Sequence, residues 1–172
     1  MSRAGIALGS NLGDRLGHLR AAIARLQEIA TPGEPFLTAP IYQAEPRLCP
    51  PDSPDFLNTV VEIDFAGSPL DLLKHTRSIE QQLGRAPAAE RNAPRVIDLD
   101  ILYVGSETSA GDLLELPHPR IHERRFVLQP LADIRPDLIL PGHAQTIAAL
   151  LAHLPCDEAP LVVLAEAGIH NC

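Results

Sequence analysis

The sequence predicts an α+β fold in which helices cover an antiparallel sheet. Some segments have apolar residues at every second position, which indicates strands. Other segments have apolar residues at every third or fourth position, which indicates helices, and the two kinds of segment alternate. These segments follow the order strand, helix, strand, strand, helix, strand. The composition, with 45% hydrophobic and 21% charged residues, is typical of a globular domain.

The N-terminal segments predict a strand, a turn and a core helix. Residues 3–8 combine small and apolar side chains and form the first expected strand. The Gly-Ser-Asn-Leu-Gly turn of residues 9–13 lacks both the dinucleotide fingerprint and the lysine of a P-loop, so on its own it predicts only an ordinary turn. A helix is expected over residues 13–29, and its buried stripe consists of Leu12, Leu16, Leu19, Ile23 and Leu26.

The next segments predict the second and third strands. Residues 34–42 form the second, and the proline-rich residues 44–55 form a loop. Residues 56–65 alternate cleanly, and their core face carries Leu57, Val61, Ile63 and Phe65. The opposite face carries Phe56, Asn58, Glu62 and Asp64. This polar face either binds a ligand or is a solvated sheet face.

A capped helix and an arginine-rich loop lead to the fourth strand. Ser68 and Pro69 are an N-cap and a first-turn proline, and Gly84 is a helix stop. The buried stripe of this helix consists of Leu72, Thr76, Ile79 and Leu83, and Glu80 projects from its last turns. Residues 85–94 contain little to bury, which favours a mobile loop.

The fourth strand, residues 94–103, places two carboxylates in an apolar segment. In an extended chain Asp98 and Asp100 share one face, while the core face carries Ile97, Leu99, Ile101 and Tyr103. The two acids lie roughly 6 to 7 Å apart along the strand, where two anions repel by about 2 kcal/mol at an effective dielectric near 20. A cation is therefore expected between them, unless the pair simply faces solvent.

The C-terminal third adds shorter elements. A Pro-His-Pro-Arg turn at residues 117–120 precedes a short helix over residues 122–128, which Pro130 is expected to interrupt. A further helix is expected over residues 146–154, and residues 161–165 form an edge strand or a packed tail. The element order matches a split βαβ, or ferredoxin-like, βαββαβ sandwich with additional C-terminal helices.

In that sandwich, helices cover one sheet face and leave the other free for a ligand. The free face is expected to carry Asn58, Glu62, Asp98 and Asp100. We expect a single domain over residues 1–172, a length that buries a substantial core.

Composition narrows the functional classes. No apolar run reaches the length of a membrane span, and no signal peptide is visible, so a cytoplasmic protein is expected. The spacing of the three cysteines is not that of a metal site, so we expect them to be reduced thiols without a functional role; they are Cys49, Cys156 and Cys172. The net charge of −8 disfavours nucleic-acid binding. We expect a monomer, although the sequence leaves the oligomeric state open.

The arginines around the acidic pair indicate a nucleotide. Carboxylates that bind Mg²⁺ commonly supply part of its shell and leave phosphate oxygens to complete it, and arginine forks suit the remaining phosphate oxygens. Two acids beside an arginine loop therefore fit a metal-bound polyphosphate, of which ATP is the commonest. His118 is equally well explained as a loop histidine, Arg124 and Arg125 as a solvated helix face, and Phe126 as core.

Five motifs together resemble the 6-hydroxymethyl-7,8-dihydropterin pyrophosphokinase family of folate biosynthesis. The resemblance runs from the first strand to about Pro141. The motifs are Gly-Ser-Asn-Leu-Gly-Asp at 9–14, Asp-Phe-Leu-Asn at 55–58, Leu-Gly-Arg at 83–85, Pro-Arg-Val-Ile-Asp-Leu-Asp-Ile-Leu at 94–102, and Pro-His-Pro-Arg-Ile-His-Glu-Arg-Arg-Phe-Val-Leu at 117–128. The last two are highly specific at that spacing.

The resemblance implies a diphosphokinase that moves pyrophosphate from ATP to the pterin hydroxymethyl group and releases AMP. Asp98 and Asp100 would bind two Mg²⁺ ions, with Asp100 nearest the hydroxyl and a candidate for removing its proton. Arg85 and Arg95 would clamp phosphates. The nucleotide side would be completed by Glu80, His118 and Arg124. The pterin side would be formed by Phe56 and Phe126 stacking on the ring, with Asn58 and backbone groups near Ala44 and Glu45 at its polar edge.

The chain departs from some members of the family at two places. Asn92 stands where some members have a tryptophan in the closing loop, and Pro119 stands where some have a tyrosine, which puts lid packing and ribose contacts in doubt. No functional residue carries over after Pro141. Two other functions stay open: a non-catalytic module that binds a nucleotide as a regulator, and a two-metal nuclease built on the acidic pair.

Overall fold

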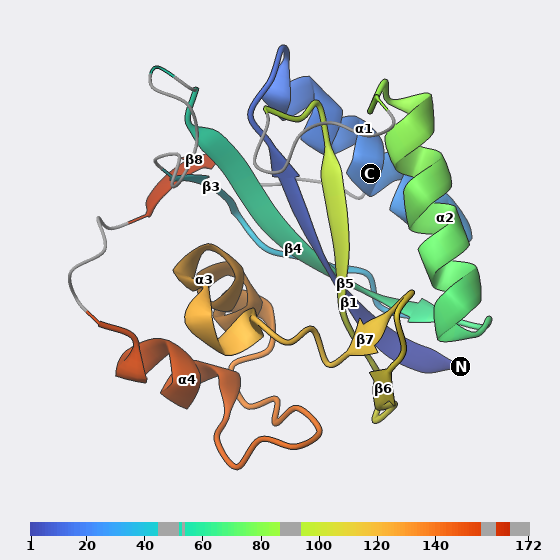
Figure 1. Cartoon of the computed structure of the whole chain (residues 1–172), viewed down its shortest axis with the longest axis vertical. Helices are drawn as coiled ribbons and strands as arrows, with labels where there is room; N and C mark the ends of the chain where they lie inside the picture. Colours follow the sequence, from blue (N-terminus) through green and yellow to red (C-terminus); the bar gives the residue numbers. More distant parts are fainter. Residues whose placement is uncertain (45–51, 53, 87–93, 156–160, 166–172) are drawn as a thin grey trace.

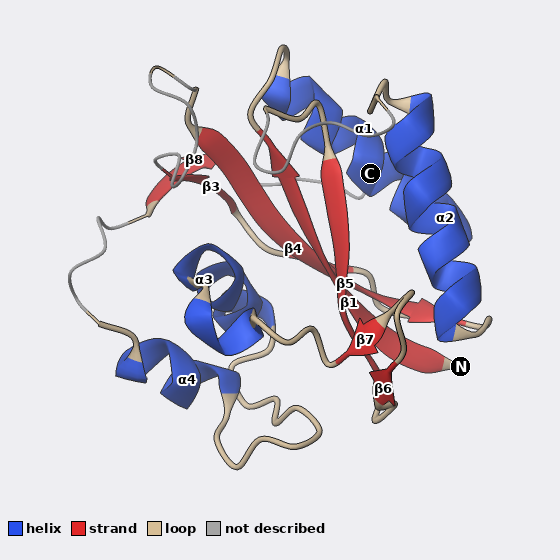
Figure 2. Cartoon of the chain, in the orientation of Figure 1, coloured by secondary structure: helices blue, strands red, loops and turns tan. Residues whose placement is uncertain are grey.

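The computed structural model describes residues 1–44, 52, 54–86, 94–155 and 161–165. One antiparallel sheet runs through the molecule, with helices on both faces (Figures 1 and 2). Its strands are β1 (Ser2–Ser10), β2 (Leu37–Thr38), β3 (Ile41–Ala44), β4 (Phe56–Phe65), β5 (Asp98–Val104) and β8 (Val162–Ala165). The helices are α1 (Arg15–Ile29), α2 (Pro69–Gln82), α3 (Arg125–Ile134) and α4 (Ile147–His153).

The strand order is β5-β1-β4-β3-β8, and β2 pairs with β4. Every pairing among the described strands is antiparallel. The segment of residues 161–165 forms an edge strand, one of its two expected states. A hairpin of β6 (Ser109–Ala110) and β7 (Glu115–Leu116), which the sequence did not predict, and the 3₁₀ turn η1 (Ile121–Glu123) follow β5. No helix among the described residues combines the length and the apolarity that crossing a bilayer requires.

The first core lies between the sheet and the helix pair α1 and α2, which lie on the same side of the sheet in Figure 1. The predicted core face of β4 is confirmed, because Leu57, Val61, Ile63 and Phe65 all belong to this cluster. The start of α2 is confirmed, whereas α1 begins at Arg15, two residues later than expected, and Leu12, predicted in its buried stripe, precedes the helix and is exposed. Asp14 caps α1 by accepting the Gly17 N–H, and Ser68 forms a capping box with Asp71 at the start of α2.

A second core lies on the opposite face, where α3 and α4 pack (Figure 1). The prediction that helices would cover only one face is therefore wrong. Pro130 lies inside α3 and does not interrupt it, because Val127, Leu128 and Leu131 bury the helix on both sides of the proline. Tertiary packing outweighs the local preference here.

Glu62 shows how far the second face is covered. We expected it on a ligand surface, but its side chain is fully buried beneath α3. Its carboxylate accepts hydrogen bonds from Arg3, Arg135 and Tyr103. Burial alone would raise the pKa of Glu62, but these three donors together lower it below its usual value. The network joins β1, β4, β5 and the end of α3.

Two strands depart from the predicted pattern. The expected second strand is divided into β2 and β3, and Pro40, which has no N–H to donate, lies between them. In β5 the register slips between the pairs Gly5↔Tyr103 and Ile6↔Ile101, which leaves Leu102 as a bulge. Tyr103 consequently lies in the second core and not with Leu99 and Ile101 in the first.

Candidate active site

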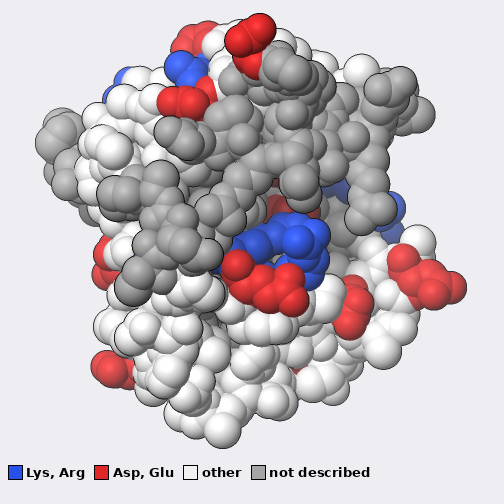
Figure 3. All heavy atoms as spheres, turned by 60° about the vertical axis from the view of Figure 1, so that its left-hand side comes forward, with Lys and Arg blue, Asp and Glu red and all other residues white. Residues whose placement is uncertain are grey.

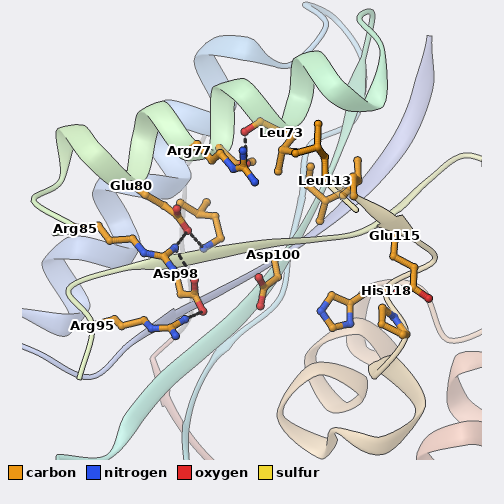
Figure 4. A pocket seen from close by; sticks show the side chains of 15 residues that line it. Leu73, Arg77, Glu80, Arg85, Arg95, Asp98, Asp100, Leu113, Glu115 and His118 are labelled. Carbon is orange, nitrogen blue, oxygen red and sulfur yellow. Dashed lines mark hydrogen bonds and ion pairs between the residues drawn. The ribbon is translucent and has the colours of Figure 1, made fainter. Parts of the chain in front are cut away.

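A cavity of about 500 Å³ opens beside the start of β5 (Figure 4). Helix α2 forms one wall, β5 forms the floor, and the β6–β7 hairpin with the segment at His118 forms the other side. The predicted residues that line it are Glu80, Arg85, Arg95, Asp98, Asp100 and His118. Residues that are far apart in the sequence therefore meet in one pocket, as the arginine and carboxylate pattern indicated.

Asp98 is the centre of the charge network. Its Oδ1 lies 2.8 Å from Arg85 Nη1, and its Oδ2 lies 3.0 Å from Arg95 Nη1. Arg85 also pairs with Glu80, so this guanidinium bridges two carboxylates (Figure 4). Burial alone would lower the pKa of Arg85, but Asp98 and Glu80 raise it. The arginine therefore stays charged where an incoming phosphate would need it.

Glu80 is anchored from the backbone of the acidic strand. The N–H of Leu99 donates to Glu80 Oε1 at 2.7 Å, which ties α2 to β5 between the two aspartates. Burial raises the pKa of Glu80 to about 7, against the hydrogen bond from Leu99 and the charge of Arg85. The helix and the strand thus hold Arg85 between them.

Asp100 has a different environment from Asp98. Within the described part of the chain, no hydrogen bond or ion pair reaches its carboxylate, which points into the pocket (Figure 4). Burial and the neighbouring Asp98 raise the pKa of Asp100 to about 6, although Arg124, Arg95 and Arg85 oppose the shift. At this carboxylate, burial and the charge of Asp98 thus outweigh the three arginines.

The donor set suits a hard divalent cation that arrives with phosphate. Asp98 and Asp100 supply carboxylate oxygens, the ligands that Mg²⁺ prefers. Across the described residues, no group of three or more metal-ligating side chains gathers. A cation between these two acids would therefore take further ligands from phosphate oxygens and water, as Mg²⁺ commonly does in nucleotide sites.

His118 lines the pocket, whereas Arg124 does not line it but acts on His118 and Asp100 through its charge. The Arg120 N–H donates to His118 Nδ1 at 3.2 Å, which assigns the ring proton to Nε2. Burial, followed by the charges of Arg124 and Arg120, lowers the pKa of His118. The ring is thus a neutral donor. Arg124 lies 5.6 Å from the Phe126 ring centre, and its charge acts on Asp100.

A second predicted group of residues lies along the sheet from Asp98. Gly9 pairs with Asp98 on one side and with Asn58 on the other, so these two residues are separated by two strand spacings, roughly 10 Å. A Cβ at Gly9 would lie 3.1 Å from Asn58 Oδ1 and 4.0 Å from Phe56, so glycine keeps room beside both. Phe56 in turn pairs with Ala44.

Some of the site was not predicted. Leu73, Thr76 and Arg77 of α2 line the pocket, and so do Leu113, Leu114 and Glu115 of the hairpin. The spacing of Leu73, Thr76, Arg77 and Glu80 on one helix face could have revealed the first three. The hairpin carries no comparable pattern. The predicted residues Glu45 and Asn92 lie outside the described residues, and Phe56, Asn58 and Phe126 do not line this cavity.

The surface also shows local positive charge on an acidic chain. Figure 3 shows a patch of Lys and Arg side chains at the centre of the view with acidic side chains beside it, and smaller groups of basic side chains at the upper left and near the right edge. The net charge of −8 therefore conceals a clustered distribution. A compact patch of this kind suits a small anion better than an extended nucleic-acid backbone.

The family model and several curated relatives that match this chain carry the name of the same enzyme family. Residues 5–136 match the family model described as 7,8-dihydro-6-hydroxymethylpterin-pyrophosphokinase. The 2-amino-4-hydroxy-6-hydroxymethyldihydropteridine pyrophosphokinase of Bacillus subtilis is 44% identical, over 75% of each chain. The enzyme of that name from Methylorubrum extorquens is 42% identical, over 90% of this chain and 94% of the relative.

Some relatives are much longer than this chain. The folic acid synthesis protein fol1 of Schizosaccharomyces pombe is 37% identical over 87% of this chain, which spans only 20% of fol1. A crystal structure of Plasmodium falciparum HPPK-DHPS with pteroate superposes with a TM-score of 0.71, at 15% identity. The match covers 88% of this chain and 44% of that one, and it shows a shared fold.

Proposed function

The chain belongs to the 7,8-dihydro-6-hydroxymethylpterin-pyrophosphokinase family, and from that premise we propose that it transfers pyrophosphate from ATP to 6-hydroxymethyl-7,8-dihydropterin in folate biosynthesis. The observation that carries the proposal is the pocket in which Asp98 meets Arg85 and Arg95 beside Asp100, whose carboxylate has no hydrogen-bond or ion-pair partner among the described residues. This combination of acids and arginine forks suits a metal-bound triphosphate.

The proposed reaction forms one phosphorus–oxygen bond, breaks another and moves one proton. The oxygen of the pterin hydroxymethyl group bonds to the β-phosphorus of ATP. The bond from that phosphorus to the oxygen shared with the α-phosphorus breaks, and its electron pair leaves with AMP. The hydroxyl proton passes to Asp100 or to a water molecule beside it. Positioning and charge neutralisation supply most of the rate in transfers of this kind.

We assign the parts of the pocket accordingly. Asp98 and Asp100 would hold Mg²⁺, two ions by the family resemblance, and the metal would neutralise phosphate charge and polarise the attacking hydroxyl. Arg85 and Arg95 exchange carboxylate partners for phosphate oxygens. His118, as a neutral donor, would bond to the nucleotide, and Arg124 would offset charge near Asp100.

We assign the pterin to the strand ends beside Asn58. The proposed ring contacts are Phe56 and Phe126, and the Asn58 amide would pair with the polar edge of the heterocycle. The space that Gly9 leaves beside Asn58 and Phe56 supports this assignment. A flat ligand there would reach towards Asp98 across β1, because β1 separates β4 from β5.

We also propose that the fold is the ferredoxin-like split βαβ arrangement, in one domain. The strand order β5-β1-β4-β3 supports it. With β2 and β3 counted as the second strand of the expected series, this order reads fourth, first, third, second. Helix α1 follows the first strand, and α2 follows the third.

The proposed activity is tested by product analysis. Incubation of the protein with ATP, Mg²⁺ and the hydroxymethyl pterin is expected to release AMP, which ion-exchange chromatography separates from ADP. Release of ADP would indicate transfer of a single phosphoryl group and would contradict the proposal. Binding of ATP without Mg²⁺ and without turnover would instead favour a regulatory module, and cleavage of nucleic acid would favour a nuclease.

Arg85→Ala is expected to lower kcat/KM for ATP about 100-fold, because it removes a charged donor from the phosphate region. Arg85→Lys restores the charge but not the fork, so we expect it to remain about tenfold below the wild type. Steady-state kinetics with varied ATP measures both effects. Arg25→Ala is the matched control, because the ion pair that Arg25 forms with Glu28 on α1 is exposed. Full recovery by lysine would contradict a role for the fork.

Asn58→Leu is expected to raise KM for the pterin at least tenfold and to leave the dissociation constant of ATP unchanged. The leucine fills a similar volume, but it leaves polar groups of the heterocycle without a partner. Thr59→Val is the control on the same strand, since Thr59 is buried and its hydroxyl bonds to Ala39 O outside the pocket. An equal rise of KM in both variants would indicate a general loss of structure.

A further inference from the structure

We propose that Asn11 is a positioning residue that fixes Arg95, and through it the phosphate clamp, so the kinetic part of this inference rests on the proposed function. Asn11 directly follows β1 and is fully buried. It does not line the pocket, whereas Arg95 does. Any effect of Asn11 on the reaction must therefore act through the residues that it contacts.

Asn11 holds the backbone of Arg95 at two points. The Arg95 N–H donates to Asn11 Oδ1 at 2.7 Å, and the Asn11 N–H donates to Arg95 O at 3.1 Å. The neighbouring Ser10 hydroxyl donates to Val96 O. The backbone N–H and the backbone carbonyl of Arg95 are thus both hydrogen-bonded to Asn11, and the backbone carbonyl of Val96 is hydrogen-bonded to Ser10.

The hydrogen bonds between Asn11 and Arg95 take the place of the next regular pair in the ladder between β1 and β5. The regular pairing of β1 with β5 ends at Gly9↔Asp98, and its continuation would place Asn11 opposite Val96. Asn11 instead pairs with Arg95, one residue out of register, and its side-chain oxygen serves as the acceptor that a backbone carbonyl would otherwise supply. A residue without a side-chain acceptor at this place would leave the Arg95 N–H unsatisfied.

As a consequence, Arg95 is held both at its backbone and at its guanidinium. The backbone of Arg95 is held by Asn11, and its side chain reaches Asp98 Oδ2 at 3.0 Å. An arginine that is already ordered loses less conformational freedom when phosphate binds, and a displacement of about 1 Å in a positioning group can cost about 100-fold in rate.

Packing alone does not account for an asparagine here. Among the described residues, Asn11 Nδ2 has no hydrogen-bond partner although it is buried. A buried donor without a partner destabilises a fold. The feature that the structure uses is therefore the acceptor oxygen, which contacts the backbone of Arg95.

Amide hydrogen exchange tests the attachment without any need for turnover. In Asn11→Ala the exchange of the Arg95 amide is expected to accelerate at least tenfold, while amides in the middle of β4 keep their protection. Asn11→Asp keeps an acceptor oxygen and is expected to retain most of the protection. An unchanged Arg95 exchange rate in Asn11→Ala would overturn the inference, and it does so whether or not the protein forms AMP.

A double-mutant cycle tests the consequence for the reaction. Asn11→Ala is expected to lower kcat/KM for ATP 10- to 100-fold and to leave KM for the pterin unchanged. In an Arg95→Ala background the same change is expected to alter kcat/KM less than threefold. Equal effects in both backgrounds would show a general structural role and contradict positioning through Arg95. Failure of the wild-type protein to form AMP would refute the proposed function, and the exchange result would still stand.

Discussion

Asp100→Asn is expected to reduce kcat by about 1,000-fold or more, because it removes one of the two carboxylates proposed to hold the metal. The substitution preserves shape and leaves the arginine network intact, since no described ion pair involves the Asp100 carboxylate. The measurement is AMP formation at saturating ATP and pterin. Asp137→Asn, on an exposed turn, is the matched control and is expected to retain wild-type turnover.

Asp98→Asn is expected to cause a broader defect. Asp98 pairs with both Arg85 and Arg95, so its neutralisation weakens the arrangement of the phosphate clamp as well as the acidic pair. KM for ATP should therefore change in this variant in addition to kcat. Near-native turnover in either aspartate variant would contradict the assignment of the acidic pair.

Glu62→Gln is expected to lower the free energy of unfolding by about 2 to 4 kcal/mol, because it leaves two arginines with reduced compensation around a fully buried group. Chemical denaturation measures the change. Glu28→Gln is the matched control, since Glu28 is exposed and its ion pair with Arg25 lies at the surface, and it is expected to stay within about 0.5 kcal/mol of the wild type.

The contribution of Glu62 should also depend on pH. Its pKa in the folded protein is lowered from the ordinary value of 4.5, so the ionised form is stabilised by folding. This stability is fully present above pH 4.5 and is lost as the pH falls through the folded pKa. The difference in stability between the wild type and Glu62→Gln should therefore shrink below pH 4.5. A constant difference down to pH 3 would contradict the assigned network.

Periodicity predicted the elements that bury one clear face. Helices α1 and α2 and strand β4 begin and end close to their expected positions, because their caps and apolar spacing agree. Local patterns could not reveal the bulge at Leu102, which depends on pairing with β1, nor the packing that carries α3 through Pro130. These features arise from contacts between distant segments.

The acidic pair was predictable because its chemistry is local, with two carboxylates at a spacing of two residues, although the strand begins at Asp98 and not at residue 94 as expected. The surroundings of Glu62 were not, because alternation predicts which residues share a face but not whether another helix covers that face. Helix α3 and Arg135 turn the expected ligand surface near Glu62 into a second core. The role proposed for Asn11 likewise depends on its contact with Arg95, which is 84 residues away in the sequence.

Attack at the β-phosphorus of ATP is tested most directly by finding which product carries that phosphorus after the reaction. ATP that carries radioactive phosphorus at the β position is incubated with the protein, Mg²⁺ and the hydroxymethyl pterin, and the products are separated. Pyrophosphoryl transfer predicts that the label moves to the pterin product and that the AMP is unlabelled. Label that remains on the nucleotide as ADP would contradict the account.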